Sequence, residues 1–181
     1  MAETLVDPVL PRIVPVENDL HLRRLQPVDA HRIFEILRAD PEIKTRVTWV
    51  SGHNSVGDLQ DTIEGFDRRQ SPRYGIIAQE ELVGYVGLFR SPISSTGYDM
   101  GYFCDPAARG RGYVPKAVAT LMALTQSSER VSSFGLNIAD DNIASQAVAS
   151  KLGFVRTDVV IRDMVLDCDE RRYERVVDGQ N

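Results

Sequence analysis

The chain has 181 residues, which is enough for one domain with a hydrophobic core and too few for two ordinary domains. Its 26 acidic and 21 basic residues give a formal net charge of −5. That balance argues against nucleic-acid binding, which depends on neutralising phosphates. No apolar run approaches the roughly 18 residues that cross a bilayer, and the acidic start lacks the pattern of a signal peptide. We therefore expect a cytoplasmic domain that binds neither nucleic acid nor membrane.

The first part of the chain predicts one strand and two helices. Residues 1–19 contain three prolines and are expected to form an extended entry segment. Alternating apolar and polar residues over 20–25 predict a strand. Helical spacing of apolar residues after Asp29 predicts a helix that stops at Pro41. Similar spacing predicts a second helix over residues 56–69.

The middle of the chain predicts consecutive antiparallel strands. Residues 74–78, 82–89 and 98–104 are rich in β-branched and aromatic residues and are separated by short turns. An amphipathic helix is expected next, over residues 113–126, and a strand over residues 134–138.

The last part of the chain predicts one more helix and a pair of strands. Asn142 is expected to open the helix and Gly153 to end it. Strand-like runs follow at residues 154–159 and 163–167. Antiparallel pairing mixed with two crossover helices indicates an α/β (α+β) domain around one mixed sheet.

One domain is expected, over residues 20–175, with residues 176–181 as a frayed tail. Cys104 and Cys168 are too few for a disulfide framework, and no cysteine and histidine cluster has metal-ligand spacing. We expect both to be free thiols in a reducing compartment, and no metal site.

A glycine-containing loop precedes the helix over residues 113–126, and its sequence is Arg109-Gly-Arg-Gly-Tyr-Val114. A helix start exposes unpaired N–H groups and the positive end of the helix dipole. Gly110 and Gly112 let that backbone approach a ligand closely, and Arg111 adds positive charge. The loop therefore suits a phosphate or pyrophosphate, although it matches neither the P-loop nor the dinucleotide fingerprint. The alternative is an ordinary strand-to-helix turn with solvated arginines.

A second motif lies about 30 residues further on, from Asn142 through Ser145 to Leu152-Gly-Phe154. Alone, it is explained by helix capping at Asn142 and Ser145, a glycine helix stop and a core aromatic residue.

Together, the two motifs resemble the GNAT superfamily of acyl-CoA-dependent N-acyltransferases. Residues 109–114 are similar to the pyrophosphate loop of that superfamily, and residues 142–154 to its second acyl-CoA motif. The resemblance covers about residues 20–167 and is nearest to the ribosomal-protein N-terminal acetyltransferase (RimL/RimJ-like) branch. It implies a mixed, mostly antiparallel central sheet flanked by about four helices.

The resemblance also implies acetyl-CoA, or another acyl-CoA, as the cosubstrate. Val114 stands where the superfamily prefers Gly or Ala, and we expect its side chain to point into the core. The residues implied around acyl-CoA are Tyr102, Phe103, Cys104, Arg109, Gly110, Arg111, Gly112, Tyr113, Val114, Asn137, Asn142 and Ser145.

The implied reaction is direct attack by a primary amine on the thioester. Ala149 stands where the superfamily often has a tyrosine acid, which leaves Ser145 as the candidate acid; capping or cofactor contact is its alternative role. Asp99 and Asp163 are candidate bases, and each could instead be a solvated strand-end carboxylate. The absence of a strong base favours an acceptor α-amine, with a pKa of roughly 7.7–8, over a lysine amine near roughly 10.4.

The acceptor is expected to be a protein or peptide N-terminus or a small amine. Trp49 and His53 lie in the connector between the first two predicted helices and are candidate acceptor-binding residues. A core role is the alternative for Trp49. A homodimer is also implied. Other functions remain open: binding acyl-CoA without transfer, moving a larger acyl group such as succinyl, or contacting RNA through the Arg-Gly-Arg-Gly sequence.

Overall fold

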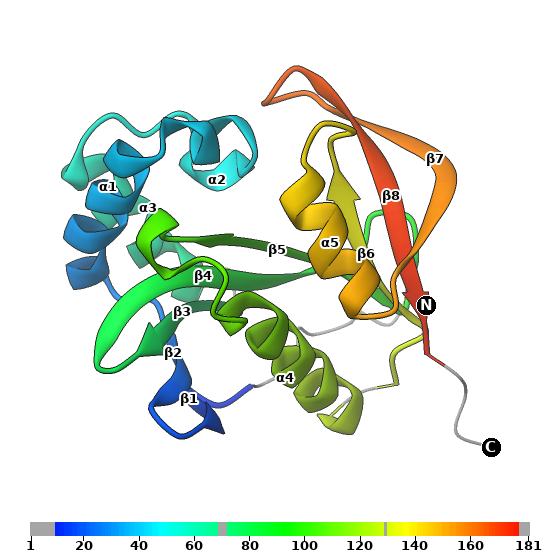
Figure 1. The fold of residues 1–181 in the computed structure, drawn as a ribbon, viewed down its shortest axis with the longest axis horizontal. Helices are drawn as coiled ribbons and strands as arrows, with labels where there is room; N and C mark the ends of the chain where they lie inside the picture. The colour runs from blue at the N-terminus through cyan, green and yellow to red at the C-terminus, as the bar shows by residue number, and fades with distance from the viewer. Residues whose placement is uncertain (1–9, 69–71, 129, 178–181) are drawn as a thin grey trace.

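The computed structural model describes residues 10–68, 72–128 and 130–177, which form an eight-stranded sheet in the order β1-β2-β3-β4-β5-β6-β8-β7 (Figure 1). The strands are β1 (Ile13–Glu17), β2 (Leu20–Arg24), β3 (Arg73–Ala78), β4 (Glu81–Arg90), β5 (Gly97–Cys104), β6 (Ser133–Ile138), β7 (Val155–Asp163) and β8 (Cys168–Val176). The helices are α1 (Ala30–Ala39), α2 (Thr48–Ser51), α3 (Val56–Arg68), α4 (Tyr113–Ser128) and α5 (Ile143–Lys151).

The sheet is antiparallel except where β5 meets β6. These two strands run parallel and pair over only three residues each, Gly97–Asp99 with Ser133–Gly135. Beyond that point β5 stays with β4, and β6 stays with β8. The two strands therefore diverge, and Figure 1 shows the resulting fork, with β5 on one side and β6 on the other.

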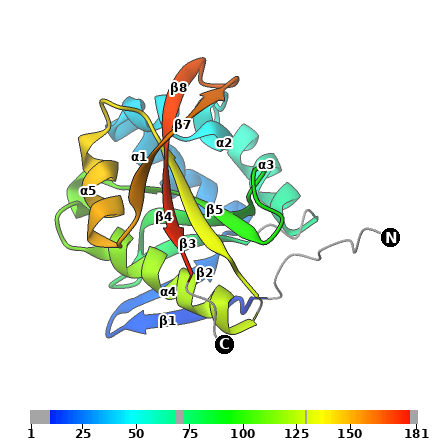
Figure 2. The same ribbon diagram turned by 90° about the vertical axis from the view of Figure 1, so that its right-hand side faces the viewer.

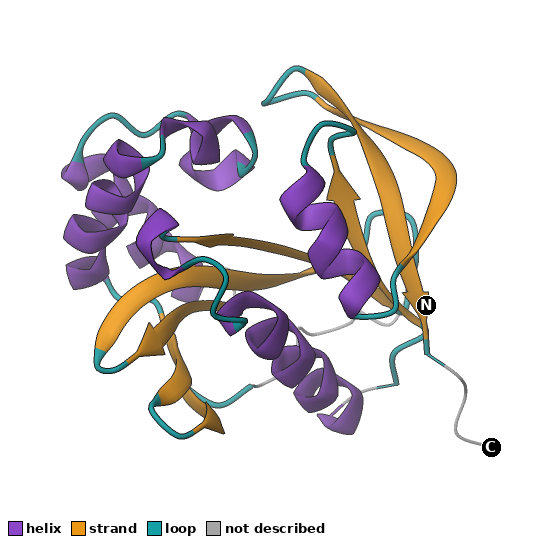
Figure 3. Cartoon of the chain, in the orientation of Figure 1, coloured by secondary structure: helices purple, strands orange, loops and turns teal. Residues whose placement is uncertain are grey.

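Helices cover both faces of the part of the sheet that contains β1 to β5. Helix α4 packs on one face through Val114, Val118 and Leu121. Helices α1 and α3 pack on the other face through apolar residues such as Ile33 and Leu59. Figure 3 shows these helices on the two sides of the strands. The core is accordingly divided into two apolar clusters, one on each side of the same strands. Among the described helices, none is long and apolar enough to cross a membrane.

The structure confirms the predicted mixed, mostly antiparallel sheet, with α2 as a short helix added inside the predicted connector. Both helix starts that motifs predicted are also confirmed: α4 begins at Tyr113, directly after the glycines, and Asn142 caps α5. Val114 is buried in the core, as expected.

Within the expected extended entry segment, Ile13–Glu17 form a paired strand, β1, and residues 1–9 lie outside the described residues. Other boundaries were predicted wrongly. Residues 164–167 form a turn, and the strand predicted over 163–167 is β8, at Cys168–Val176. Val176 belongs to that strand, and the Val177 amide donates to Ser132 at 2.9 Å. Residues 176 and 177 are therefore not part of a frayed tail, and the rest of the predicted tail, residues 178–181, lies outside the described residues. β8 pairs with β6 on one side and with β7 on the other, and Figure 2 shows β7 and β8 side by side.

Candidate functional site

The loop between β5 and α4 is built to expose its backbone. Asp105 begins a short 3-10 helix, Pro106–Ala108, and its carboxylate accepts a hydrogen bond from the Ala107 amide at 2.9 Å. Gly110 and Gly112 then adopt φ values of +78° and +77°, a region that side chains disfavour. These two turns bring the chain directly into the first turn of α4.

A cavity of about 610 Å³ lies between this loop, α5 and the 3-10 helix Pro41–Thr45. We call it the larger cavity. Its apolar wall comes from β5, α4 and α5, and its rim is polar. A volume of this size is typical of small-molecule sites. The larger cavity is lined by these predicted residues: Tyr102, Phe103, Cys104, Arg109, Gly110, Gly112, Tyr113, Val114, Asn142 and Ser145.

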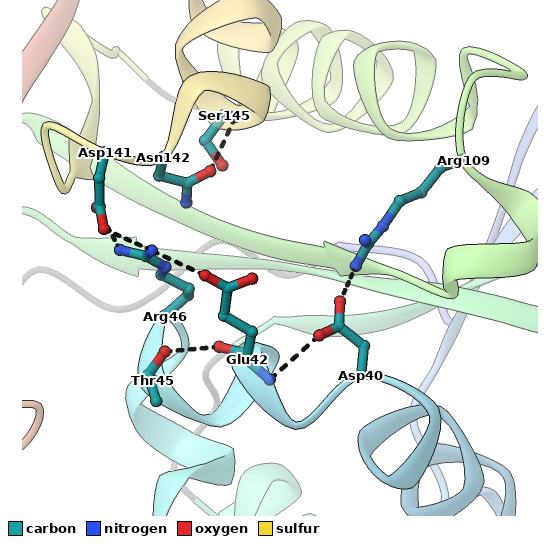
Figure 4. Close-up of polar contacts among 8 residues, drawn as sticks. All are labelled: Asp40, Glu42, Thr45, Arg46, Arg109, Asp141, Asn142 and Ser145. Atoms are coloured by element: carbon teal, nitrogen blue, oxygen red, sulfur yellow. Dashed lines mark hydrogen bonds and ion pairs between the residues drawn. The ribbon is translucent and has the colours of Figure 1, made fainter.

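Two ion pairs cross the rim of the larger cavity (Figure 4). The Arg109 guanidinium pairs with the carboxylate of Asp40, at the end of α1. Arg46 donates to both carboxylate oxygens of Asp141, at 2.6 and 2.9 Å, and to Glu42 at 3.1 Å. The hydrogen bond that Arg46 donates to Asp141 raises the pKa of Arg46 above its ordinary value and lowers the pKa of Asp141. The pairs join the α1–α2 region to the loops that precede α4 and α5.

The N-terminus of α5 faces the larger cavity. The Asn142 side chain accepts a hydrogen bond from the Ser145 amide at 3.1 Å, as an N-cap does (Figure 4). In the described part of the chain, no hydrogen bond involves the Ser145 hydroxyl, so the cap uses only the Ser145 backbone. Tyr102 donates to the Ser145 carbonyl at 3.4 Å, and burial raises the pKa of Tyr102 to about 12.

Removing this cap should destabilise the protein measurably. We expect Asn142→Ala to cost about 1 kcal/mol of unfolding free energy, because one helix amide loses its acceptor. For a chain of this length, that corresponds to a melting temperature about 2–4 °C lower. Asn142→Asp keeps the accepting oxygen and should melt close to wild type. Equal losses in the two variants would contradict the capping role.

A second cavity, of about 410 Å³, adjoins the larger one at the fork between β5 and β6. We call it the smaller cavity. Five residues line both cavities: Arg46, Val47, Tyr102, Asn142 and Ser145. Trp49 also lines the smaller cavity and packs against Tyr85, with ring centroids 5.1 Å apart. Trp49 thus belongs to the cavity wall and to the aromatic packing beneath it, and its Nε1 is buried with no hydrogen-bond partner among the described residues.

Asp99 lies in the smaller cavity at the point where β5 leaves β6. Its carboxylate accepts a hydrogen bond at 2.6 Å from Arg172 of β8, whose side chain is only 1% exposed. The Arg172 guanidinium also donates to Asn137 at 3.3 Å. It lies so close to Gly135 that a Cβ there would come within 1.9 Å of it. Arg172 therefore compensates the charge of Asp99 at the apex of the fork, the point where β5 and β6 separate.

Two further carboxylates enter the smaller cavity from the β7–β8 hairpin. Asp163 accepts hydrogen bonds from the Thr48 hydroxyl at 2.9 Å and from the Val165 and Leu166 amides at 2.8 Å each. Glu170 lies on the neighbouring strand, half-buried. Burial and the nearby Asp163 raise the pKa of Glu170 to about 7, against the opposing effect of Arg46.

Most of the predicted site residues are brought together by the fold, and two are not. His53 lines neither cavity; its Nε2 lies 2.6 Å from the Thr62 hydroxyl, within the α2–α3 region. Arg111 is exposed and also lines neither cavity, because the chain turns between the two glycines. Asn137 lines the smaller cavity, not the one that contains the glycine loop.

Three charged residues of the site were missed from the sequence: Arg46, Glu170 and Arg172. Arg46 lies between the first predicted helix and the connector, where no sequence pattern predicts an element. The other two lie in a run of charged residues on β8. A period of two within that run, with Cys168, Glu170 and Arg172 on one face, was the available signal.

Comparison with known proteins identifies the family of this chain. The family model described as an acetyltransferase (GNAT) domain matches residues 19–155. The ribosomal-protein-serine acetyltransferase of Escherichia coli (strain K12) is 24% identical over 146 residues, which cover 76% of this chain and 81% of that protein.

Solved structures of similar proteins share the fold. RimL, a ribosomal L7/L12 α-N-protein acetyltransferase solved with coenzyme A, superposes with a TM-score of 0.79 at 21% identity, over 93% of this chain and 99% of that one. RimJ of Mycobacterium smegmatis, solved with a CoA disulfide, gives 0.75 at 16% identity, over 87% and 81%. With its glycine loop, capped α5 and forked sheet, the chain belongs to the GNAT acetyltransferase family.

Proposed function

We propose that the protein transfers the acetyl group of acetyl-CoA to the α-amine of a polypeptide or of a similar small molecule. The observation that carries the proposal is the pair of adjoining cavities that meet at the fork, beside Tyr102 and Ser145. A cofactor in one cavity and an amine in the other can react at their junction without a covalent enzyme intermediate. Holding both reactants in that geometry supplies much of the rate enhancement.

The larger cavity fits the chemistry of acyl-CoA. Gly110 and Gly112 expose backbone N–H groups at the start of α4, where the helix dipole favours a pyrophosphate. Arg109 adds a cation whose partner, Asp40, is itself on the rim. The apolar wall of the larger cavity, which includes Phe103 and Val114, suits the uncharged arm of the cofactor. Val114 is compatible with that role because its side chain turns into the core.

The smaller cavity fits an amine acceptor. It contains the carboxylates of Asp99, Asp163 and Glu170, which favour a cationic ammonium group. Trp49 supplies an aromatic wall. The curated relative acetylates a ribosomal-protein serine, as its name states, which supports a polypeptide N-terminus as the acceptor. A homodimer and a cytoplasmic location remain predictions.

Ser145 is proposed to donate a proton to the departing CoA sulfur. Its hydroxyl takes no part in capping α5, and the residue lines both cavities. Ser145→Ala should lower kcat by about 100-fold, the low end for a general acid, because a thiolate is a good leaving group. Acetyl-CoA affinity and melting temperature should stay near wild type. Ser150→Ala, on an exposed position of the same helix, is the control, and kcat values that match in both variants would remove Ser145 from the reaction.

The function is tested by mass spectrometry of acceptors incubated with the protein and acetyl-CoA, succinyl-CoA or another acyl-CoA. Acceptors should include peptides with free N-termini, Nα-blocked lysine peptides, polyamines and amino acids. We expect a mass increase of one acetyl group on free N-termini. Binding of acetyl-CoA without modification of any amine would instead indicate an acyl-CoA-binding protein.

A further inference from the structure

We propose that Glu170 is the base that takes the proton from the acceptor ammonium. The inference rests on the proposed function and names the proton acceptor within the same site. Three carboxylates reach the smaller cavity, and they differ in their hydrogen-bond and ion-pair partners. Asp99 is paired with a buried arginine and both oxygens of Asp163 accept hydrogen bonds, whereas no described residue donates to Glu170.

Asp99 is held by a strong charge partner. The Arg172 guanidinium donates to it at 2.6 Å and is itself almost completely buried. An uncompensated buried charge is costly, and Asp99 supplies the counter-charge of this buried guanidinium. Asp99 therefore acts as a fixed charge at the apex of the fork.

Asp163 is occupied in shaping the hairpin turn. One carboxylate oxygen accepts the Val165 and Leu166 amides, and the other accepts the Thr48 hydroxyl. Both oxygens of Asp163 are therefore already engaged by donors of this chain. Asp163 therefore fixes the position of the hairpin tip against α2.

Glu170 is the remaining carboxylate. Among the described residues, none donates a hydrogen bond or forms an ion pair with it. The register places Ile161 of β7 directly opposite Glu170, so Asp163, two residues further along β7, is its diagonal neighbour on the same face. The negative charge of Asp163 disfavours a second negative charge beside it.

The electrostatic surroundings leave Glu170 poised near neutral pH. Arg46 faces it across the cavity, but that guanidinium already binds Asp141 and Glu42. The charged or titratable groups facing Glu170 are Asp163 on β7, Cys168 on its own strand, Arg46 before α2, and Asp99 with Arg172 deeper at the fork. The resulting pKa of about 7 lies close to that of an α-amine, roughly 7.7–8.

In the proposed step, the Glu170 carboxylate takes a proton from the acceptor ammonium and becomes a carboxylic acid. The freed nitrogen lone pair attacks the thioester carbonyl carbon; the C–N bond forms and the C–S bond breaks. The sulfur leaves with its electron pair and takes a proton. The acetylated nitrogen loses its second proton, and Glu170 returns its own to solvent. The balance is ammonium plus thioester giving amide, thiol and one proton.

The test is the pH dependence of kcat/KM for a peptide with a free N-terminus, from pH 6 to pH 9.5. We expect Glu170→Gln to lose about 100-fold at pH 7, a typical size for removing a general base. The loss should shrink towards pH 9.5, where the acceptor amine is already neutral. The pH profile of kcat/KM for Glu170→Gln should follow the titration of the acceptor amine rather than that of a group on the protein.

Three further measurements separate this role from a structural one. Glu170→Asp should recover part of the activity at pH 7, because it restores a carboxylate. Asp169→Asn, on the exposed face of the same strand, should behave as wild type. The affinity of Glu170→Gln for acetyl-CoA, measured by calorimetry, should be unchanged.

The outcomes distinguish the inference from the function. If wild type acetylates the peptide and Glu170→Gln has the same pH profile, the inference is wrong and the proposed function stands. If wild type binds acetyl-CoA and acetylates no amine, the proposed function fails and the inference fails with it.

Discussion

Gly112→Asp should abolish measurable acetyl-CoA binding, or weaken it by at least about 100-fold, which corresponds to roughly 2.7 kcal/mol. Gly112 has a φ of +77° and lines the larger cavity at the start of α4. An aspartate there places a negative charge where backbone N–H groups and the helix dipole favour an anion. Calorimetry with acetyl-CoA measures the effect.

The control for this variant is another glycine with the same backbone strain. Gly153 has a φ of +75° at the end of α5 and lines neither of the two adjoining cavities. Gly153→Asp should lower the melting temperature by an amount similar to Gly112→Asp and leave acetyl-CoA affinity intact. If both variants bind acetyl-CoA as wild type does, the loop is not the pyrophosphate site.

Arg172→Met should lower the free energy of unfolding by about 3–5 kcal/mol. The substitution removes the partner of Asp99, whose side chain is only 13% exposed, and leaves a carboxylate charge at the apex of the fork. Urea denaturation, followed by circular dichroism, measures the loss. A change below about 1 kcal/mol would show that water or another group compensates Asp99.

A second substitution tests the cause of that loss. The double variant Asp99→Asn with Arg172→Met has no charge at either position and should recover most of the stability. Single Asp99→Asn completes the double-mutant cycle, and the coupling between the two positions should be well above the roughly 0.5 kcal/mol of independent sites. If the two losses simply add, the ion pair does not explain the instability of Arg172→Met.

The features that could be predicted from the sequence are those set by local patterns. Apolar alternation predicted β2 and β6, and β-branched and aromatic residues predicted β3 to β5, because each of these strands has at least one face in the core. The starts of α4 and α5 were predictable because Gly112 and Asn142 satisfy local backbone requirements. The residues expected around the larger cavity were implied by the resemblance of these two motifs to the GNAT superfamily.

The C-terminal hairpin could not be predicted in the same way. β8 turns Glu170 and Arg172 towards the fork, so its inward face is charged and apolar alternation is lost. The carboxylate of Asp163 holds the turn through two amides, and that contact gives no apolar signal either. The base proposed here lies on this hairpin, and its burial depends on strands far apart in the sequence.

The fork has a consequence for stability inside the cell. Past Asp99 and Gly135, β5 and β6 each have only one partner strand, so every second backbone amide along them faces the gap. Such amides exchange with solvent hydrogen unless a ligand covers them. Binding of acetyl-CoA should slow the exchange of these amides. It should also stabilise the native state by RT ln(1 + [L]/Kd), where [L] is the free acetyl-CoA concentration and Kd its dissociation constant. Resistance to unfolding would then rise and fall with the supply of activated acetyl groups.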